Sequence, residues 1–244
     1  LGAQSPNGDS VFLALALGIA LSLLKESLAA PVIRVFQALN AAIIKIVLVI
    51  MEIAPYAVFC LIAGVVASMG LEVLRALAIY SLVVIAGLLS MILIVYPTIL
   101  RLVAGVGYRR FFSAIAPAQL LAFSSSSSSA TLPVTIECGE NRLGVKEEVA
   151  SFVLPLGATI NMDGTALYQG VAAVFIAQLF GINLDLSAQL TIVLTATLAS
   201  IGTAGVPGVG MIMLVIVLQS VNMPPEVMTA GVAVIFGVDR LLAM

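Results

Sequence analysis

Six consecutive serines, Ser124–Ser129, lie inside a stretch without charged residues that runs from about residue 111 to residue 136. Each serine hydroxyl needs a hydrogen-bond partner, and the hydrocarbon core of a bilayer supplies none. Polar groups at such a depth occur where they are packed within protein or line a cavity that holds a ligand. The serine run therefore predicts part of a binding site, with close packing between helices as the structural alternative.

A single carboxylate marks a second candidate site. Asp163 is the only charged residue between Glu148 and Asp185, and a buried carboxylate inside a membrane by default marks an ion or substrate pathway. Gly157 and Gly164 would let the helix unwind there and turn its carbonyl oxygens inward, as ligands for a small cation such as Na⁺. The alternative is an ion pair with Arg or Lys on an adjacent helix. Further oxygen atoms at this locus come from Thr159, Asn161 and Thr165.

Two segments rich in small and hydroxylated residues, Ser128–Pro133 and Ser200–Pro207, both close with a proline. Paired interrupted apolar segments of opposite topology indicate a secondary transporter built from inverted repeats, with its site where the broken helices meet. The N-termini of half-helices there would present backbone N–H groups and the positive end of a helix dipole. We therefore expect a ligand that carries a carboxylate.

The elements that must position these residues belong to a membrane protein. Hydrophobic residues make up 62% and charged residues 9% of the 244 positions, and the mean hydropathy is +1.23. About 20 apolar residues are needed to span a bilayer. Uncharged stretches of at least that length cover residues 76–100, 111–136, 164–184 and 186–225. The composition thus predicts a multi-pass integral membrane protein, which we expect to be all-α and to lie in the cell (inner) membrane.

The distribution of basic residues predicts the topology of two hairpins. If cytoplasmic loops carry the excess of Lys and Arg, the basic loops at residues 101–110 and 142–146 lie inside. The stretch 111–136 then starts and ends on the cytoplasmic side and must enter and return as a hairpin. The stretch 186–225 is about twice as long as one span and has acidic residues at its borders. It should form a second hairpin that enters from outside.

Two other functional classes fit less well. An ion channel could line its pore with Ser, Thr and Gly, but a channel usually repeats one filter around an axis. This chain instead has two unlike hairpins with Asp163 between them. The sequence contains no His, and its buried polar residues include no pair of nucleophile and base. We therefore expect no enzymatic activity, and we expect no nucleic-acid partner.

Three motifs resemble those of the dicarboxylate/amino acid:cation symporters, the glutamate transporter family. They occur in the family's order and spacing and cover Ser127–Thr135, Leu156–Tyr168 and Ala199–Gly208. The resemblance implies a homotrimer in which each protomer moves a transport domain like an elevator against a static scaffold. This chain would supply the C-terminal, transport-domain portion.

The resemblance also implies the boundaries of the parts. Residues 1–110 would hold transmembrane helices that belong partly to the scaffold: the end of the fourth, the fifth at 34–70 and the sixth at 74–103. Residues 111–244 would form the core of the transport domain. Its parts would be an inner re-entrant hairpin (111–140), an unwound seventh helix (147–181), an outer hairpin that acts as the gate (187–222) and the start of the eighth helix (226–244).

Individual site residues follow from the same resemblance. Six positions match substrate-binding positions of the family: Ser127, Ser128, Ser129, Thr165, Val206 and Gly210. The serines and Thr165 would face carboxylates of the substrate. One sodium site would use Gly157, Asn161 and Asp239, and a second would use Asn161 with Asp163. A third would use backbone carbonyls of Thr159, Met162, Ser200, Ile201 and Thr203.

The expected function is a symporter that couples cation entry, with Na⁺ as the cation, to uptake of aspartate or glutamate. Members that transport amino acids usually carry an Asp where this chain has Ala243, and that Asp pairs with the substrate's α-ammonium group. A C4-dicarboxylate such as succinate or malate is therefore the alternative substrate, although the outer tip Gly205–Gly208 favours an amino acid. Proton coupling through Asp163 and Asp239 is the alternative to sodium coupling.

Overall fold

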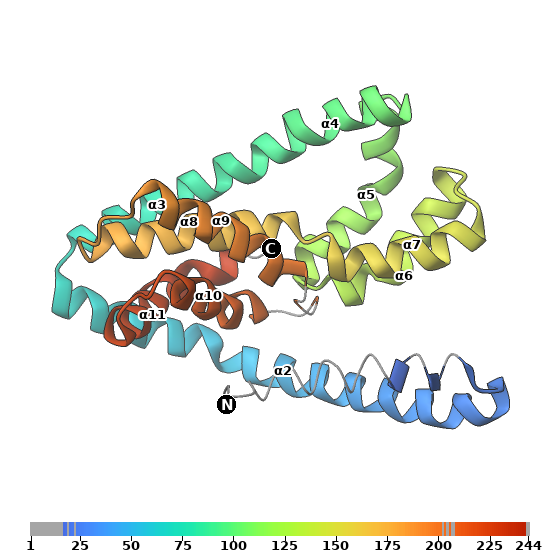
Figure 1. Ribbon diagram of the computed structural model, residues 1–244, viewed down its shortest axis with the longest axis horizontal. Helices are drawn as coiled ribbons and strands as arrows, with labels where there is room; N and C mark the ends of the chain where they lie inside the picture. Colours follow the sequence, from blue (N-terminus) through green and yellow to red (C-terminus); the bar gives the residue numbers. More distant parts are fainter. Residues whose placement is uncertain are drawn as a thin grey trace. The chain divides into compact units, whose positions relative to one another are not determined.

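The computed structural model describes residues 17–18, 20–21, 23–201, 203, 205 and 208–242. Within these residues every regular element is a helix (Figure 1), which confirms the predicted all-α class. The chain divides into two units, residues 1–53 and residues 54–244. The first helix with assigned bounds, α2, runs from Glu26 to Met69 and contributes to both units. All other elements with assigned bounds belong to the second unit.

A long apolar helix follows α2. The chain turns at Gly70, whose φ of +79° lies in the left-handed region that favours glycine. The helix then consists of α3 (Glu72–Ser90), the π-helical η1 (Met91–Val95), α4 (Tyr96–Ile99) and the π-helical η2 (Leu100–Ala104). These 33 residues form the one described helix that is long and apolar enough to cross a membrane. The sixth helix expected at 74–103 falls within these bounds.

Two antiparallel segments joined by a short turn come next. Helix α5 (Tyr108–Ser125) ends at Ser126, whose φ of 50° reverses the chain, and α6 (Ser128–Glu137) packs back against α5. A π-helical turn, η3 (Cys138–Arg142), continues α6, and α7 (Glu147–Ile160) packs on α6. The inner hairpin expected at 111–140 corresponds to α5, α6 and the start of η3. That this hairpin re-enters a membrane stays a prediction.

Helix α8 (Asp163–Leu179) is the centre of the remaining helices. It packs against α3 and against three later helices: α9 (Leu186–Ile201), α10 (Val209–Ser220) and α11 (Pro225–Leu242). The unwound seventh helix expected at 147–181 corresponds to α7 and α8, which are separated by Asn161 and Met162. The outer hairpin expected at 187–222 corresponds to α9 and α10, and the eighth helix expected from residue 226 corresponds to α11.

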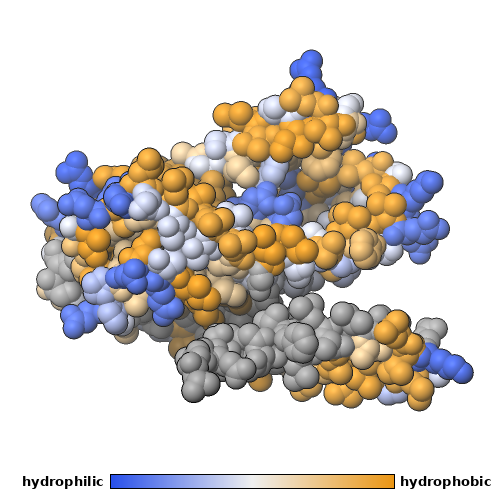
Figure 2. Space-filling model, in the orientation of Figure 1, coloured by the Kyte–Doolittle hydropathy of each residue, from blue (hydrophilic) through white to orange (hydrophobic). Residues whose placement is uncertain are grey.

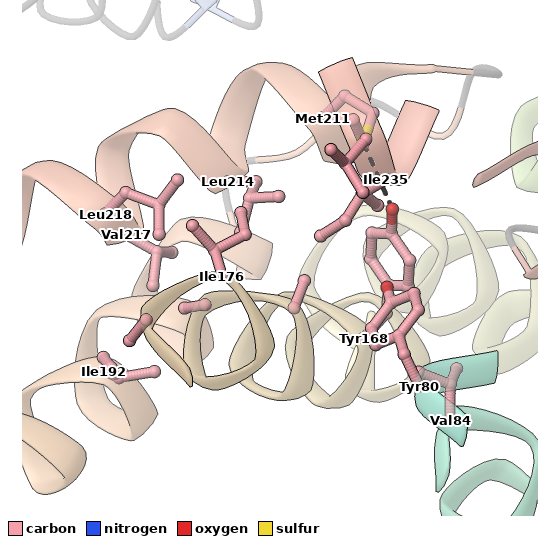
Figure 3. Packing of buried hydrophobic residues seen from close by; sticks show 14 of the residues in the cluster. Tyr80, Val84, Tyr168, Ile176, Ile192, Met211, Leu214, Val217, Leu218 and Ile235 are labelled. Carbon is pink, nitrogen blue, oxygen red and sulfur yellow. Dashed lines mark hydrogen bonds between the residues drawn. The ribbon is translucent and has the colours of Figure 1, made fainter. Parts of the chain in front are cut away.

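The core of the second unit lies where these helices meet α8. Figure 3 shows large side chains from five helices in one cluster, which includes Tyr80, Val84, Tyr168, Ile176, Ile192, Met211, Leu214, Val217, Leu218 and Ile235. Small residues allow the helices to approach: a Cβ added to Gly231 of α11 would lie 2.5 Å from Cγ2 of Ile176 on α8. The visible outer surface is also largely apolar, and strongly hydrophilic residues gather at helix ends and loops (Figure 2).

Candidate functional site

The serine run ends one helix and begins the next. Ser127 is the N-cap of α6: its hydroxyl accepts the backbone N–H of Ala130 at 3.2 Å, and its carbonyl accepts the hydroxyl of Thr131 at 2.8 Å. N-capping by serine satisfies one of the free N–H groups at a helix start. Ser124 differs, because its hydroxyl donates to the carbonyl of Leu121 within its own helix. The serine that caps a helix therefore lies in the C-terminal half of the run, whereas Ser124 bonds only within α5.

The tips of the two helix pairs touch each other. The hydroxyl of Ser127 donates to the carbonyl oxygen of Gly205 at 2.8 Å, and the backbone N–H of Ser129 donates to the same oxygen at 3.2 Å. A Cβ added to Gly205 would lie 3.0 Å from Cβ of Ser128 and 3.1 Å from the backbone nitrogen of Ser129. Only glycine fits this approach without a shift of the backbone, so Gly205 closes the contact between the tips.

The helix break predicted around the Asp163 motif is present. Helix α7 ends at Asn161, with φ −99° and ψ 66°, and Met162 has similar non-helical angles. Asp163 then begins α8, where its negative charge interacts favourably with the positive end of the helix dipole. Its Oδ2 accepts a 2.7 Å hydrogen bond from the hydroxyl of Tyr96 in α4. In the described part of the chain Asp163 has this neutral partner and no ion pair with Arg or Lys, contrary to the alternative considered above.

A second carboxylate, that of Asp239, is buried and accepts a hydrogen bond from a tyrosine of α8. The hydroxyl of Tyr168 donates to Oδ1 of Asp239 at 2.6 Å, and the sulfur of Met211 lies 3.1 Å from the same hydroxyl (Figure 3). Asp239 is 8% exposed. The neighbouring Gln169 donates from Nε2 to the carbonyl of Gly210 at 3.2 Å. These bonds tie α8 to α10 and α11, while Oε1 of Gln169 is buried without a hydrogen-bond partner in the described part of the chain.

A cavity of about 510 Å³ lies between these polar elements. Three helices begin at its wall: α6 at Ser128, α8 beside Thr165 and α10 beside Gly210. The N-terminus of a helix carries a partial positive charge and free N–H groups, so three of them around one cavity favour an anion. Apolar side chains of the long helix form another wall, among them Ile85, Leu88 and Ile92. The cavity thus suits a small anionic solute with an apolar part.

The predicted site residues fall into two groups. Lining the cavity are the substrate positions Ser127, Ser128, Thr165 and Gly210 and the cation positions Met162, Thr203 and Asp239. Ser129 lies beside it, at the contact with Gly205. Six predicted residues are not among those that line the cavity: Gly157, Thr159, Asn161, Asp163, Ser200 and Ile201. Val206 and Ala243 lie outside the described residues. The ligand roles of all these residues stay predictions.

The predicted backbone ligands at the end of α9 have side chains that are already engaged. The hydroxyl of Ser200 donates to the carbonyl of Thr197 at 2.8 Å, and the hydroxyl of Thr203 donates to the carbonyl of Ala199 at 2.8 Å. Both residues are buried. Because the hydroxyl hydrogens are used within the helix, an oxygen ligand from this segment would come from the backbone or from hydroxyl lone pairs.

The site residues that were predicted individually do not include Tyr96, Tyr168 and Gly205, which contact them. Ser126 belongs to the predicted serine run, and it lines the cavity with a buried hydroxyl that has no partner in the described part of the chain. The sequence does indicate that both tyrosines need a hydrogen-bond partner, because each tyrosine hydroxyl lies inside an apolar span. No local pattern, however, indicates which carboxylate that partner is.

Interrupted apolar helices that begin at the wall of one cavity are typical of secondary transporters. The comparison with known proteins gives the family: the model of the sodium:dicarboxylate symporter family matches residues 9–244. The chain belongs to this family. It is therefore an integral membrane protein, and the predictions that it resembles these symporters and is not an enzyme are confirmed.

Known relatives are similar over most of this chain. It is 47% identical over 210 residues to excitatory amino acid transporter 3 of Mus musculus, covering 86% of this chain and 40% of that protein. It is 46% identical over 208 residues to excitatory amino acid transporter 1 of Homo sapiens, covering 84% and 38%. An excitatory amino acid transporter of Caenorhabditis elegans is 41% identical over 229 residues, covering 93% and 45%. The chain thus spans less than half the length of these relatives.

Proposed function

We propose that this chain forms the substrate- and ion-binding part of a secondary active symporter that couples Na⁺ entry to uptake of an acidic amino acid. The observation that carries the proposal is the cavity at which α6, α8 and α10 all begin. Three positive helix ends around a small cavity favour carboxylates. The names of the relatives, excitatory amino acid transporters, support an amino acid as the substrate.

The serines at the turn between α5 and α6, called the serine tip, and Thr165 would hold the substrate carboxylates. Ser126 offers a buried hydroxyl without a partner, and Ser128 begins α6 at the cavity wall. Thr165 lies in the first turn of α8 on the same wall. Charge-assisted hydrogen bonds from hydroxyl and N–H groups to a carboxylate are stronger than neutral ones. An acidic solute would therefore bind through its carboxylates with its carbon chain toward the apolar side.

Cation coupling follows from the charges near the cavity. Asp239 lines the cavity, and Asp163 begins the helix that forms part of its wall. A substrate with two carboxylates adds negative charge where a buried carboxylate already lies, and like charges repel strongly at low dielectric. Bound Na⁺ ions near Asp239 and Asp163 would offset this repulsion. Substrate and cations would then bind together, which is the requirement for symport.

The contact between the tips would act as the closed gate. Both hydrogen bonds across it end on the carbonyl oxygen of Gly205. Movement of the segment between α9 and α10 would break these two bonds and open the cavity. We further propose that the complete protein is a homotrimer in the cell (inner) membrane and that α5–α11 move as an elevator-type transport domain with re-entrant hairpins.

The test is uptake by proteoliposomes that contain the full-length protein. Labelled L-aspartate and labelled succinate are supplied separately, with and without an inward Na⁺ gradient, and with a proton gradient in a third set. We expect accumulation of aspartate that requires the Na⁺ gradient. Accumulation of succinate alone would replace the amino acid by a C4-dicarboxylate as substrate. Uptake that follows the proton gradient alone would refute sodium coupling, and flux that never exceeds equilibrium would indicate a channel.

A further inference from the structure

We infer that Tyr96 is a positioning residue for Asp163, holding this carboxylate in the orientation in which it binds a cation. The inference rests on the proposed function in one respect, namely that Asp163 takes part in cation binding. It adds a residue from a different helix, 67 positions earlier in the chain. It also gives the long apolar helix an indirect part in ion binding, through Asp163.

The geometry leaves one carboxylate oxygen for another ligand. The hydroxyl of Tyr96 donates to Oδ2 of Asp163 at 2.7 Å. Within the described residues Oδ1 of Asp163 accepts no hydrogen bond. A carboxylate has lone pairs on both oxygens and can accept several partners. One oxygen is thus fixed by the tyrosine, and the other stays available for a cation.

The chemical type of the partner matters. A Lys or Arg at this position would neutralise Asp163 and remove the attraction for a cation, whereas a tyrosine hydroxyl is a neutral donor at ordinary pH. In the described part of the chain no basic side chain forms an ion pair with Asp163. The structure therefore fixes the carboxylate through a neutral donor and places no basic partner on it within the described residues, as a cation ligand requires.

Asp163 needs this support because of its place in the chain. It follows two residues, Asn161 and Met162, whose backbone angles are not helical. A side chain at such a break has fewer neighbours within its own helix to restrict its rotamers. Binding groups are held most precisely when hydrogen bonds to a rigid neighbouring element lock their rotamers. Tyr96 supplies such a bond from the long helix.

The backbone around Tyr96 is itself irregular. Pro97 lacks an N–H group and cannot form the usual helical hydrogen bond. The backbone N–H of Tyr96 reaches back to the carbonyl of Met91, five residues earlier, and π-helical turns lie on both sides of α4. The hydroxyl of Thr98 donates to the carbonyl of Ile94 at 2.5 Å, which provides an extra bond near the proline. Single π-helical turns occur often at functional sites because they shift the direction of nearby side chains.

The experiment measures sodium binding without substrate. The full-length protein in detergent is melted at increasing NaCl, with choline chloride keeping the ionic strength constant, because a ligand of the folded state raises the melting temperature. In Tyr96→Phe we expect the half-saturating Na⁺ concentration to rise about tenfold, the effect of losing ~1.4 kcal/mol of binding free energy. The melting temperature in choline chloride alone should also fall, because a hydrogen bond to a carboxylate is lost. The rise in melting temperature that NaCl adds to this value should begin only at the higher Na⁺ concentration, and the preference for Na⁺ over Li⁺ should fall.

A matched control is Tyr108→Phe. The Tyr108 ring is exposed and packs on Phe112, and its hydroxyl forms no hydrogen bond in the described part of the chain. This variant should bind Na⁺ like the unchanged protein. In an Asp163→Asn background the Tyr96→Phe change should add no further loss, because the two residues act through one interaction.

The outcomes separate this inference from the proposed function. If Tyr96→Phe keeps the sodium dependence of the unchanged protein, or binds Na⁺ more tightly, the inference is wrong even when aspartate uptake is sodium-driven. A variant that lowers the melting temperature equally in both salts would show a purely structural role and would also overturn it. If aspartate is not transported but Tyr96→Phe still weakens Na⁺ binding as expected, the proposed substrate is wrong and the inference stands.

Discussion

Tyr168 and Asp239, 71 residues apart in the chain, are joined by a 2.6 Å hydrogen bond from the tyrosine hydroxyl to Oδ1 of the carboxylate. Tyr168 is 5% exposed and Asp239 is 8% exposed, and both line the cavity. A buried carboxylate without a donor is costly, so this bond stabilises the packing of α11 on α8 as well as the charge itself. Together with the bond between Tyr96 and Asp163, it places a tyrosine on each of the two carboxylates predicted to bind cations.

The first prediction concerns this bond. Tyr168→Phe removes only the hydroxyl and should lower the free energy of unfolding by about 1.5–3 kcal/mol, the usual value for a hydrogen bond to a charged group. Thermal melting in detergent measures the change. Tyr80→Phe is the control, because the Tyr80 hydroxyl is buried without a hydrogen-bond partner in the described part of the chain. A similar loss of stability in both variants would contradict the assigned role of Tyr168.

The second prediction compares two serines of the same run. Ser127→Ala removes the N-cap of α6 and the 2.8 Å bond to the carbonyl of Gly205. Loss of an N-cap alone costs about 0.5–2 kcal/mol, so we expect lower stability and weaker substrate binding. Ser124→Ala, whose exposed hydroxyl bonds only within α5, should have little effect on either quantity. Equal effects on aspartate affinity from both changes would exclude a special role for Ser127.

The third prediction concerns the close approach at Gly205. In Gly205→Ala the new Cβ would lie 3.0 Å from Cβ of Ser128 and 3.1 Å from the nitrogen of Ser129, so the tips must separate. Overpacking of this kind costs about 1–3 kcal/mol. We expect the dissociation constant for substrate to rise about tenfold, which corresponds to ~1.4 kcal/mol. The measurement is binding of labelled aspartate to the full-length protein.

The control for Gly205 is Gly170→Ala in α8, where an added Cβ meets no atom within 4 Å. Alanine is the better helix former by about 1 kcal/mol, so this variant should be equally or more stable and should bind aspartate normally. Unchanged affinity in Gly205→Ala would mean that the tips tolerate separation and that their contact is not the gate.

The fourth prediction concerns pH and the start of α9. Asp185 is exposed, and its carboxylate accepts the backbone N–H of Ala188 at 2.8 Å and the hydroxyl of Ser187. The hydrogen bond from Ala188, with help from that of Ser187, lowers the pKa of Asp185 below its ordinary value. A lowered pKa in the folded state means that the carboxylate stabilises the fold above its ordinary pKa of about 3.9. This contribution is lost as the pH falls through the lowered value.

Melting of the full-length protein between pH 7 and pH 3 tests this sign. Asp185→Asn keeps an oxygen that can cap the helix but cannot titrate, so its melting temperature should fall less over the acidic range than that of the unchanged protein. If the two curves stay parallel down to pH 3, the capping carboxylate of Asp185 does not contribute to the pH dependence.

Much of the architecture could be predicted from the sequence because it depends on local properties. Runs of apolar residues long enough to span a bilayer predicted an all-α membrane protein, since helices satisfy their own backbone hydrogen bonds in hydrocarbon. A helix break near Asp163 was also predicted, but it lies at Asn161 and Met162, whereas Gly157 and Gly164, the residues expected to cause it, are helical. The three motifs at Ser127–Thr135, Leu156–Tyr168 and Ala199–Gly208 identified the family, which the comparison confirmed.

The sequence by itself therefore determined the class, the family, the approximate ends of the helices and most of the polar residues near the cavity. Only the tertiary structure decided which of them meet: Tyr96 with Asp163, Tyr168 with Asp239, and the serine tip with Gly205. The physical reason is that helix breaks and apolar runs depend on neighbours in the chain, whereas these pairs are 67 to 78 residues apart. Their contacts depend on how the helices pack around α8, which no local pattern encodes.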